Sequence, residues 1–282
     1  MTHQIFDLIG SPILWFIFIC LFFLEKKFQL RKRVQQITKR LVINFIFAIP
    51  AFVLLRILLI PEMVWLAIIN EKLHFGLNYF LHLPYWLANV VAFLLLDYTN
   101  YLWHILNHKI PLLWRFHLVH HTDHDLDVTT AVRFHFGEII GSAVFRAAAV
   151  FLIGASPLIV LVYEIIFEAA TQFHHSNLKL PFRPEKILNK IIVTPRMHGI
   201  HHSVIREETD SNYSVIFSFW DRVHRTIRLG IPQDQIVIGV PSYGDKEELT
   251  IGYLLKLPFT KIRRWPHTDV ERKYNEGNEL EP

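Results

Sequence analysis

Histidines at short, repeated spacings are the residues of this sequence best suited to chemistry. The pattern His-x2-His-His occurs twice, at 117–121 and 198–202, and His104 and His108 lie four residues apart. With 17 histidines in 282 residues, chance would give only about 0.06 copies of the five-residue pattern, so two copies are a strong signal. Neutral imidazole is the commonest nitrogen ligand for metals, and residues at i, i+3 and i+4 of a helix project to one side. The sequence therefore predicts a site for two metal ions.

Ligand chemistry narrows the choice of metal without settling it. Cys20 is the only cysteine and lies in an apolar block, so a thiolate site is excluded. Imidazole suits both iron and zinc, and the usual order of affinities favours zinc over ferrous iron. A hydrolytic zinc site takes about three protein ligands and keeps one position for water, whereas eight or more histidines indicate two ions. An oxygen-activating pair of iron ions matches this number better, with zinc as a substitute.

The elements that must position these histidines are long apolar segments. Hydrophobic residues make up 52% of the chain and mean hydropathy is +0.29, more than an ordinary soluble domain has. Segments 8–24 and 41–60 are long enough to cross a bilayer, and the loop between them is basic. By the positive-inside rule this loop is predicted to be cytoplasmic. The modest net charge of +4 argues against nucleic acid as a partner.

Two further crossings are predicted. After an external or interfacial segment at 61–84, a third span at 85–106 has Asp97, Asn100, His104 and His108 on one face, which suggests a site near its cytoplasmic end. An ordinary hydrogen-bond network between helices would give the same polar stripe. The apolar stretch 139–170 is predicted to be a hairpin that breaks at 154–157, because a single crossing would put the second His-x2-His-His element on the opposite side.

Three regions follow from this pass along the chain. Residues 1–84 contain two spans and the basic loop, residues 85–229 the catalytic region, and residues 230–282 a cytoplasmic carboxyl-terminal tail. The stretch after Trp265 is charged and has no apolar pattern, so we expect it to be disordered. The predicted fold class is all-α, a multi-pass membrane bundle with a cytoplasmic helical cap that carries a histidine-rich site for two metals.

At these histidines the chain resembles the fatty acid hydroxylase/sterol desaturase family of integral-membrane, non-haem di-iron enzymes. Its histidine boxes correspond to His104/His108, to the element at 117–121 and to the element at 198–202, and its H-x-N element to His175-Ser176-Asn177. The nine metal ligands that this indicates are His104, His108, His117, His120, His121, His175, His198, His201 and His202. His174 and His124 are less certain candidates.

Other segments between Tyr85 and Leu229 also resemble the family. They are Thr130–Glu138, Thr194-Pro195-Arg196, Asp210-x-Asn212-Tyr213 and Trp220-Asp221-Arg222. Val223–Thr226 departs from the family pattern, which usually has an aromatic residue and a glycine before the threonine. The residues that could support the ligands or contact substrate are Arg133, His135, Glu138, Asp97 and Asn177. Helix capping and head-group contact are the plainer interpretations for the first three of these.

The resemblance implies oxidation of an unactivated C–H bond of a membrane lipid, such as an acyl chain or sterol, by two iron ions (Fe2+/Fe3+), O2 and external electrons. Hydroxylation is expected ahead of desaturation. The chain has neither a G-x-G-x-x-G loop nor a C-x-x-C-H haem attachment site. By family analogy, the electron donor would be a separate cytochrome b5, ferredoxin or reductase.

Two other functions fit the histidines. A zinc-dependent lipid hydrolase could use metal-bound hydroxide, with Glu138 or Glu168 as the base. A metal carrier or sensor would bind and release zinc, but it needs a polar route across the bilayer. Outside the histidine-rich end, the predicted spans carry few ionisable groups, so the carrier is poorly supported.

Overall fold

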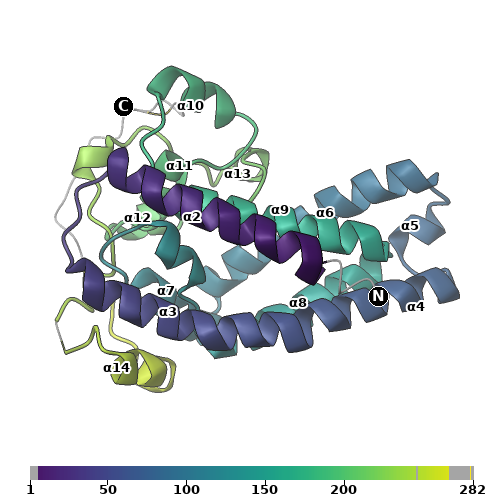
Figure 1. Cartoon of the computed structure of the whole chain (residues 1–282), viewed down its shortest axis with the longest axis horizontal. Helices are drawn as coiled ribbons and strands as arrows, with labels where there is room; N and C mark the ends of the chain where they lie inside the picture. The colour runs from purple at the N-terminus through teal and green to yellow at the C-terminus, as the bar shows by residue number, and fades with distance from the viewer. Residues whose placement is uncertain (1–5, 246, 267–279, 281–282) are drawn as a thin grey trace.

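The computed structural model describes residues 6–245, 247–266 and 280. Within these residues the fold is helical, and the only β-type pairing consists of isolated bridges. The long helices are α2 (Ser11–Lys27), α3 (Ile37–Leu54), α4 (Ile60–Leu73), α6 (Tyr85–Lys109), α8 (Phe136–Ile153) and α9 (Pro157–His175). They run side by side. Most of the short helices gather at one end, on the left in Figure 1, whereas the short helix at Leu77–Phe80 lies at the opposite end.

The short elements connect or cap the long ones. The α-helices among them are α5 (Leu77–Phe80), α7 (Pro111–His121), α10 (Phe182–Leu188), α11 (Pro195–His201), α12 (Arg206–Thr209), α13 (Phe219–Val223) and α14 (Ile251–Lys256). The π-helical turns are η1 (Phe6–Gly10) and η2 (Leu55–Leu59), and the 3₁₀ turns are η3 (Val128–Val132), η4 (Gln233–Gln235) and η5 (Leu257–Phe259).

The helix that follows the basic loop is longer than the predicted second span. The helix that begins at Ile37 continues through η2 into α4 and reaches Leu73, where the sequence predicted an external segment. Pro61 does not end it, although proline lacks an N–H and its ring crowds the carbonyl four residues earlier. The π-helical turn η2 directly precedes Pro61, and such turns are where a helix absorbs this kind of irregularity. The α3–α4 unit therefore extends along the whole bundle (Figure 1).

The predicted hairpin is present. The helix α8 ends at Gly154, which has a left-handed φ of +72°, and α9 begins at Pro157 after Ser156 accepts a hydrogen bond from the Ile159 N–H. Glycine adopts the left-handed conformation without strain, and proline suits the first position of a helix because its missing N–H would have no partner there. This break returns α9 toward the histidine-rich end.

Three helical stretches of the described chain are long and apolar enough to cross a membrane: Phe6–Lys27, Ile37–Phe80 and Phe136–Ile153. The predicted third span forms α6, but α6 is not among the three. Its polar stripe lowers its hydropathy, and Asp97, Asn100 and His108 on that stripe are buried inside the protein. The cytoplasmic position of the histidine-rich end stays a prediction.

The core of the bundle lies between α4, α6, α8 and α9. Met63 and Ala67 of α4 pack there with Val150 of α8 and Val160 of α9, all almost completely buried. Side chains from the segments 240–245 and 247–265 pack on the histidine-bearing end, where Tyr243 and Leu254 contact the cluster around Trp114 and Leu118. The predicted disordered tail lies outside the described residues, apart from Pro266 and Leu280.

Candidate metal centre

The structure brings all nine predicted ligands together in two adjacent groups. One consists of His104, His108, His117, His121 and His201, and the other of His120, His175, His198 and His202. In each group the possible ligand nitrogens lie within 4.8 Å of one another. The rings of His121 and His202 stack with centroids 4.4 Å apart, which joins the two groups. Their role as ligands stays a prediction.

Four elements supply these side chains. The helices α6, α7, α9 and α11 converge at one end of the bundle, and each presents its histidines from one face. Pro111 and Pro195 are the first residues of α7 and α11, so each helix begins shortly before its histidines. Because the i, i+3, i+4 spacing divides each His-x2-His-His element between the two groups, α7 and α11 each contribute to both.

Backbone carbonyls fix the orientation of three of the rings. The Nδ1 atoms of His104, His175 and His201 lie 2.8, 2.8 and 2.7 Å from the carbonyl oxygens of Tyr213, Thr171 and Ser211. A carbonyl only accepts a hydrogen bond, so each Nδ1 must carry the proton and each Nε2 is left with a lone pair. These three Nε2 atoms therefore point into the groups as bare donors of electron pairs.

Contacts between the rings show that a cation fits. The Nε2 atom of His175 lies 3.0 Å from that of His120 and 3.0 Å from that of His198, and His198 and His202 are 3.1 Å apart by the same atoms. Nitrogens bound at about 2.0–2.1 Å to one ion lie about 3 Å apart. Facing lone pairs repel unless a cation lies between them, so the donor set of this group suits a metal.

The electrostatics keep the rings neutral. Burial lowers the pKa of His198, His201 and His202 well below that of an exposed histidine, and neighbouring histidines lower it further. Neutral imidazole is the form that binds a metal. In addition, His201 Nε2 and His108 Nε2 are buried without a hydrogen-bond partner among the described residues, as a nitrogen suited to bind a metal would be, and His108 Nδ1 lies 3.6 Å from Asp210 Oδ1.

Of the five residues predicted to support the ligands, Glu138 is the one with a direct contact to a grouped histidine. Its Oε1 atom accepts a hydrogen bond from His117 Nδ1 at 2.8 Å. Asp97 instead accepts from the N–H groups of Ile216 and Phe217 and from Trp220. His135 caps α8, and Asn177 holds the backbone of Arg31. These two and Asp97 have structural roles within the described chain.

The two less certain ligand candidates lie outside both groups. His174 Nδ1 is 3.2 Å from the carbonyl oxygen of Val215, and its ring packs on His198 with centroids 4.2 Å apart. His124 Nε2 is 2.9 Å from the carbonyl oxygen of Tyr243. Sequence reasoning missed the carbonyls of Ser211, Tyr213 and Thr171, because a main-chain oxygen leaves no signal in residue type.

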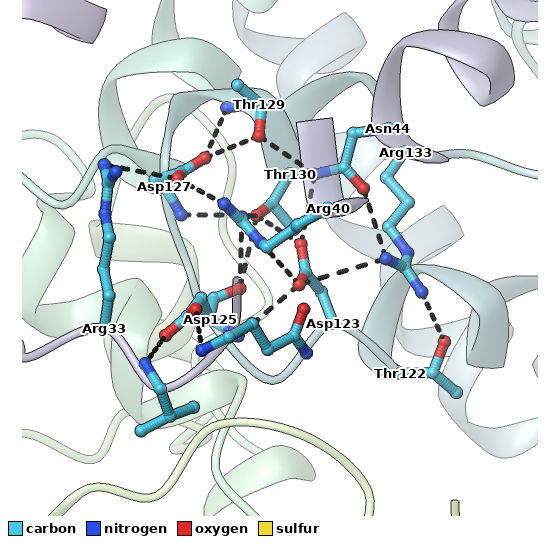
Figure 2. Close-up of polar contacts among 12 residues, drawn as sticks. Arg33, Arg40, Asn44, Thr122, Asp123, Asp125, Asp127, Thr129, Thr130 and Arg133 are labelled. Carbon is cyan, nitrogen blue, oxygen red and sulfur yellow. Dashed lines mark hydrogen bonds and ion pairs between the residues drawn. The ribbon is translucent and has the colours of Figure 1, made fainter. Parts of the chain in front are cut away.

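Arg133 belongs to a buried ionic network that anchors the end of α7 (Figure 2). It donates to the Val119 carbonyl at 3.0 Å and to Asn44 Oδ1 at 3.2 Å, so it joins α7 to α3. Arg40 donates to Asp123 Oδ1 at 2.7 Å and also pairs with Asp127. Burial alone would raise the pKa of Asp123, but Arg40 and Arg133 outweigh it and hold the pKa at about 2.

This network also changes the interpretation of the basic loop. Two of its basic residues, Arg31 and Arg40, are buried and bind internal partners. Val34 and Gln35 donate their N–H groups to Asp125 at 2.8 and 2.9 Å. The loop therefore holds the segment that follows His121 against the start of α3, and a charged loop residue need not face lipid when acidic partners lie beneath it.

A cavity of about 470 Å³ connects the histidines to the apolar helices. Its histidine end includes His104, His117, His120 and His175. Its other walls are mostly aromatic and aliphatic side chains of α2 and α3, which belong to candidate membrane spans. They include Leu14, Trp15, Phe18, Phe45, Ile49 and Phe52. A long apolar molecule could thus reach the histidines from between α2 and α3.

The sequence pattern of one family, described as fatty acid hydroxylase, matches residues 89–226. This region contains all nine grouped histidines. Residues 89–226 therefore have the sequence pattern of the fatty acid hydroxylase family. The matched region begins within α6 and ends just after α13, so it includes every histidine-bearing element of the two groups.

Relatives of known activity agree with the family. The chain is 32% identical over 181 residues to an ornithine lipid hydroxylase of Rhizobium tropici, which covers 62% of this chain and 51% of the relative. It is 29% identical over 202 residues to an alkylglycerol monooxygenase of Danio rerio, covering 69% and 43%. For a cholesterol 25-hydroxylase of Rattus norvegicus the identity is 24% over 161 residues, covering 56% and 53%.

These matches span about half the length of the relatives. All three relatives are named for oxidation of a lipid or a sterol. No solved protein structure matches the chain.

Proposed function

We propose that this protein is a membrane-bound lipid hydroxylase that uses O2 and holds two iron ions, one in each histidine group. The observation that carries the proposal is the cavity between α2 and α3, which ends at the two histidine groups and is lined there by five of their nine members. A lipid hydrolase would need only the polar scissile bond of its substrate and water at the metals. Oxidation of an unactivated carbon requires the apolar chain itself to reach them. The lipid- and sterol-oxidising relatives support the same reaction class.

The residues of the chain have separate tasks in this proposal. Five histidines would hold one ion and four the other, which leaves positions for small ligands in the second group. Bound iron would supply the activation of O2 and the oxidation of a C–H bond. Glu138 and the carbonyls of Ser211, Tyr213 and Thr171 orient the rings, which reduces the structural rearrangement needed to bind metal.

The cavity walls would hold the lipid and exclude water. Trp15, Phe18 and Phe45 offer flat apolar surfaces on which an acyl chain or a sterol can lie. Exclusion of water protects a strongly oxidising site from side reactions. The electrons would come from a separate donor such as cytochrome b5, a ferredoxin or a reductase. We therefore expect no turnover with NAD(P)H and the purified protein alone.

Metal analysis of the full-length protein tests this proposal. Protein purified anaerobically from iron-supplemented cells should contain about two irons per chain, with Mössbauer spectra of a coupled pair. His201→Ala removes a ligand from the first group and His120→Ala from the second, so each should lower the iron content by about one. His82 is exposed and has a φ of +48°, which asparagine tolerates, so His82→Asn is the matched control.

Oxygen labelling tests the reaction itself. A mixture of acyl lipids and sterols, incubated with the protein, a reductase system and ¹⁸O2, should give a product that contains one ¹⁸O atom. Stoichiometric zinc under iron-replete conditions, together with lipid cleavage in the absence of O2, would replace the proposal with the hydrolase. Zinc movement across liposomes that contain the protein would replace it with the carrier.

A further inference from the structure

Three ionisable side chains lie in the hairpin, away from the histidines. Arg146 of α8 forms an ion pair with Glu164 of α9, and Glu168 lies one turn further along α9. Arg146 and Glu168 both line the apolar cavity. Charged groups within membrane-spanning helices are costly to bury, so they are retained mainly where they have a partner or a function.

The ion pair accounts for the burial of Glu164 but not for the position of Glu168. Glu164 is almost fully buried and balances the charge of Arg146, as expected for two helices held together by a polar contact. Glu168 makes no hydrogen bond or ion pair with any residue in the described part of the chain, and Arg146 donates a hydrogen bond there only to Glu164. The guanidinium of Arg146 also lies over the Phe167 ring, 4.6 Å from its centroid. The carboxyl of Glu168 and the remaining donors of Arg146 therefore both belong to the lining of a mostly apolar cavity.

The helices α8 and α9 place Arg146 and Glu168 at about the same distance from the histidines. On α8, Glu138, Ser142 and Arg146 follow at i, i+4 and i+8 and all line the cavity, beginning at the residue that contacts His117. On α9, Glu168 precedes His175 by seven residues. At 1.5 Å per residue, both separations are about 10–12 Å along the helix axis. Arg146 and Glu168 are thus a second fixed point in the cavity, about two helical turns from the histidines.

We propose that Arg146 and Glu168 form a polar subsite that binds a neutral hydroxyl group of the lipid substrate. A hydroxyl accepts a hydrogen bond from the Arg146 guanidinium and donates one to the Glu168 carboxyl, so it satisfies both groups at once. A carboxylate would satisfy Arg146 but would face Glu168 and Glu164 at close range. An ammonium group would satisfy Glu168 but would face Arg146.

The subsite adds positioning of the substrate to the proposed function, and its effect on the reaction rests on that function. A hydroxyl held at Arg146 and Glu168 leaves the carbon about 10 Å away at the histidines, so the distance between the two sites selects the carbon that is oxidised. Different lipids should then be oxidised at a constant distance from their hydroxyl group. Binding at the subsite itself requires neither metal nor turnover, so the two proposals can fail separately.

Ligand binding to metal-free protein tests the subsite. Radiolabelled octadecan-1-ol, its methyl ether and octadecane are titrated into full-length protein in nanodiscs. The ether accepts a hydrogen bond but donates none. We expect the wild-type protein to bind the alcohol about tenfold or more tightly than the ether, since a buried hydrogen bond to a charged group is worth about 1.5–3 kcal/mol. Glu168→Leu should remove this preference and leave the ether and the alkane unaffected.

The control is Ile166→Ala, at an exposed position of the same helix, and it should keep the preference. Glu164→Gln preserves a hydrogen-bond acceptor for Arg146 outside the cavity and should keep it as well. Equal binding of alcohol and ether by the wild-type protein would overturn the subsite, as would tighter binding of octadecylamine than of the alcohol. A preference that depends on Glu168 in a protein without oxygenase activity would support the subsite and overturn the proposed function.

Discussion

Individual side chains in the metal centre are held through their second ring nitrogen. Carbonyl oxygens orient His104, His175 and His201, whereas a carboxylate of Glu138 orients His117. The carboxylate differs from the carbonyls because it carries a full charge, which makes the imidazole a stronger ligand. Glu138 also lies near the amino terminus of α8, where the helix dipole favours an anion.

We therefore predict that Glu138→Gln weakens metal binding while the fold is kept. The amide oxygen of glutamine can still accept the hydrogen bond from His117, but the charge is lost. Loss of such a supporting partner typically lowers metal affinity about 10–100-fold. Competition with a chelator of known affinity measures the effect, and Glu71→Gln, at an exposed position of α4, is the control. Unchanged competition would assign Glu138 to capping alone.

At the scale of elements, the turn between α4 and α6 and the break between α8 and α9 depend on each other. Gly76 has a φ of +112°, and a Cβ atom placed on it would lie 2.5 Å from the backbone of Gly154. Asn78 reinforces this contact with a hydrogen bond to the Gly154 carbonyl at 3.5 Å. Close approach of two glycines thus lets the two turns pack together at the end of the bundle opposite the histidines (Figure 1).

Gly76→Ala should consequently destabilise the protein. The left-handed region costs a residue with a side chain about 1–2 kcal/mol, and the contact with Gly154 adds a steric cost. We expect a lower midpoint of thermal unfolding, measured in one detergent for all variants. Gly252→Ala is the matched control, since no atom lies within 4 Å of its added Cβ and alanine favours the helix α14. Equal midpoints for the two variants would show that the turns are not tightly packed.

At the scale of the whole molecule, the cavity is what joins the membrane-facing helices to the metal centre. It is bounded by α2 and α3 on one side and by α6, α8 and α9 on the other, so no single element determines its width. Ala48 of α3 is a small residue in its wall. Ala48 is not one of the residues that orient the grouped histidines. A larger side chain at this position would therefore narrow the cavity and leave the histidine contacts intact.

We predict that Ala48→Trp blocks the lipid and leaves the metals in place. Overfilling a packed space costs about 1–3 kcal/mol, so binding of a long-chain substrate should weaken about tenfold or more. Turnover of lipid and iron content per chain are measured on the same preparation. Val42→Trp, at an exposed position on the same helix, should change neither quantity. A loss of iron in Ala48→Trp would show that the variant distorts the centre instead.

Much of the metal centre could be predicted from sequence because its signal is local. The spacing of the histidines on α7 and α11 is fixed by the period of the helix, and the break at Gly154–Pro157 is marked by residues that cannot continue a helix. The all-α class and the first apolar span follow from the length of the apolar segments. These features need no knowledge of which elements touch.

Other features were decided only by tertiary contacts. The helix from Ile37 to Leu73 passes Pro61 because its packing on α8 and α9 outweighs a local stop signal. Arg40 is buried because Asp123 and Asp127, more than 80 residues away, provide its partners. The division of the histidines into groups of five and four, and the pairing of Arg146 with Glu164 across the hairpin, likewise depend on how helices meet. Residue type and spacing determine which face of a helix is reactive, but only packing determines what that face meets.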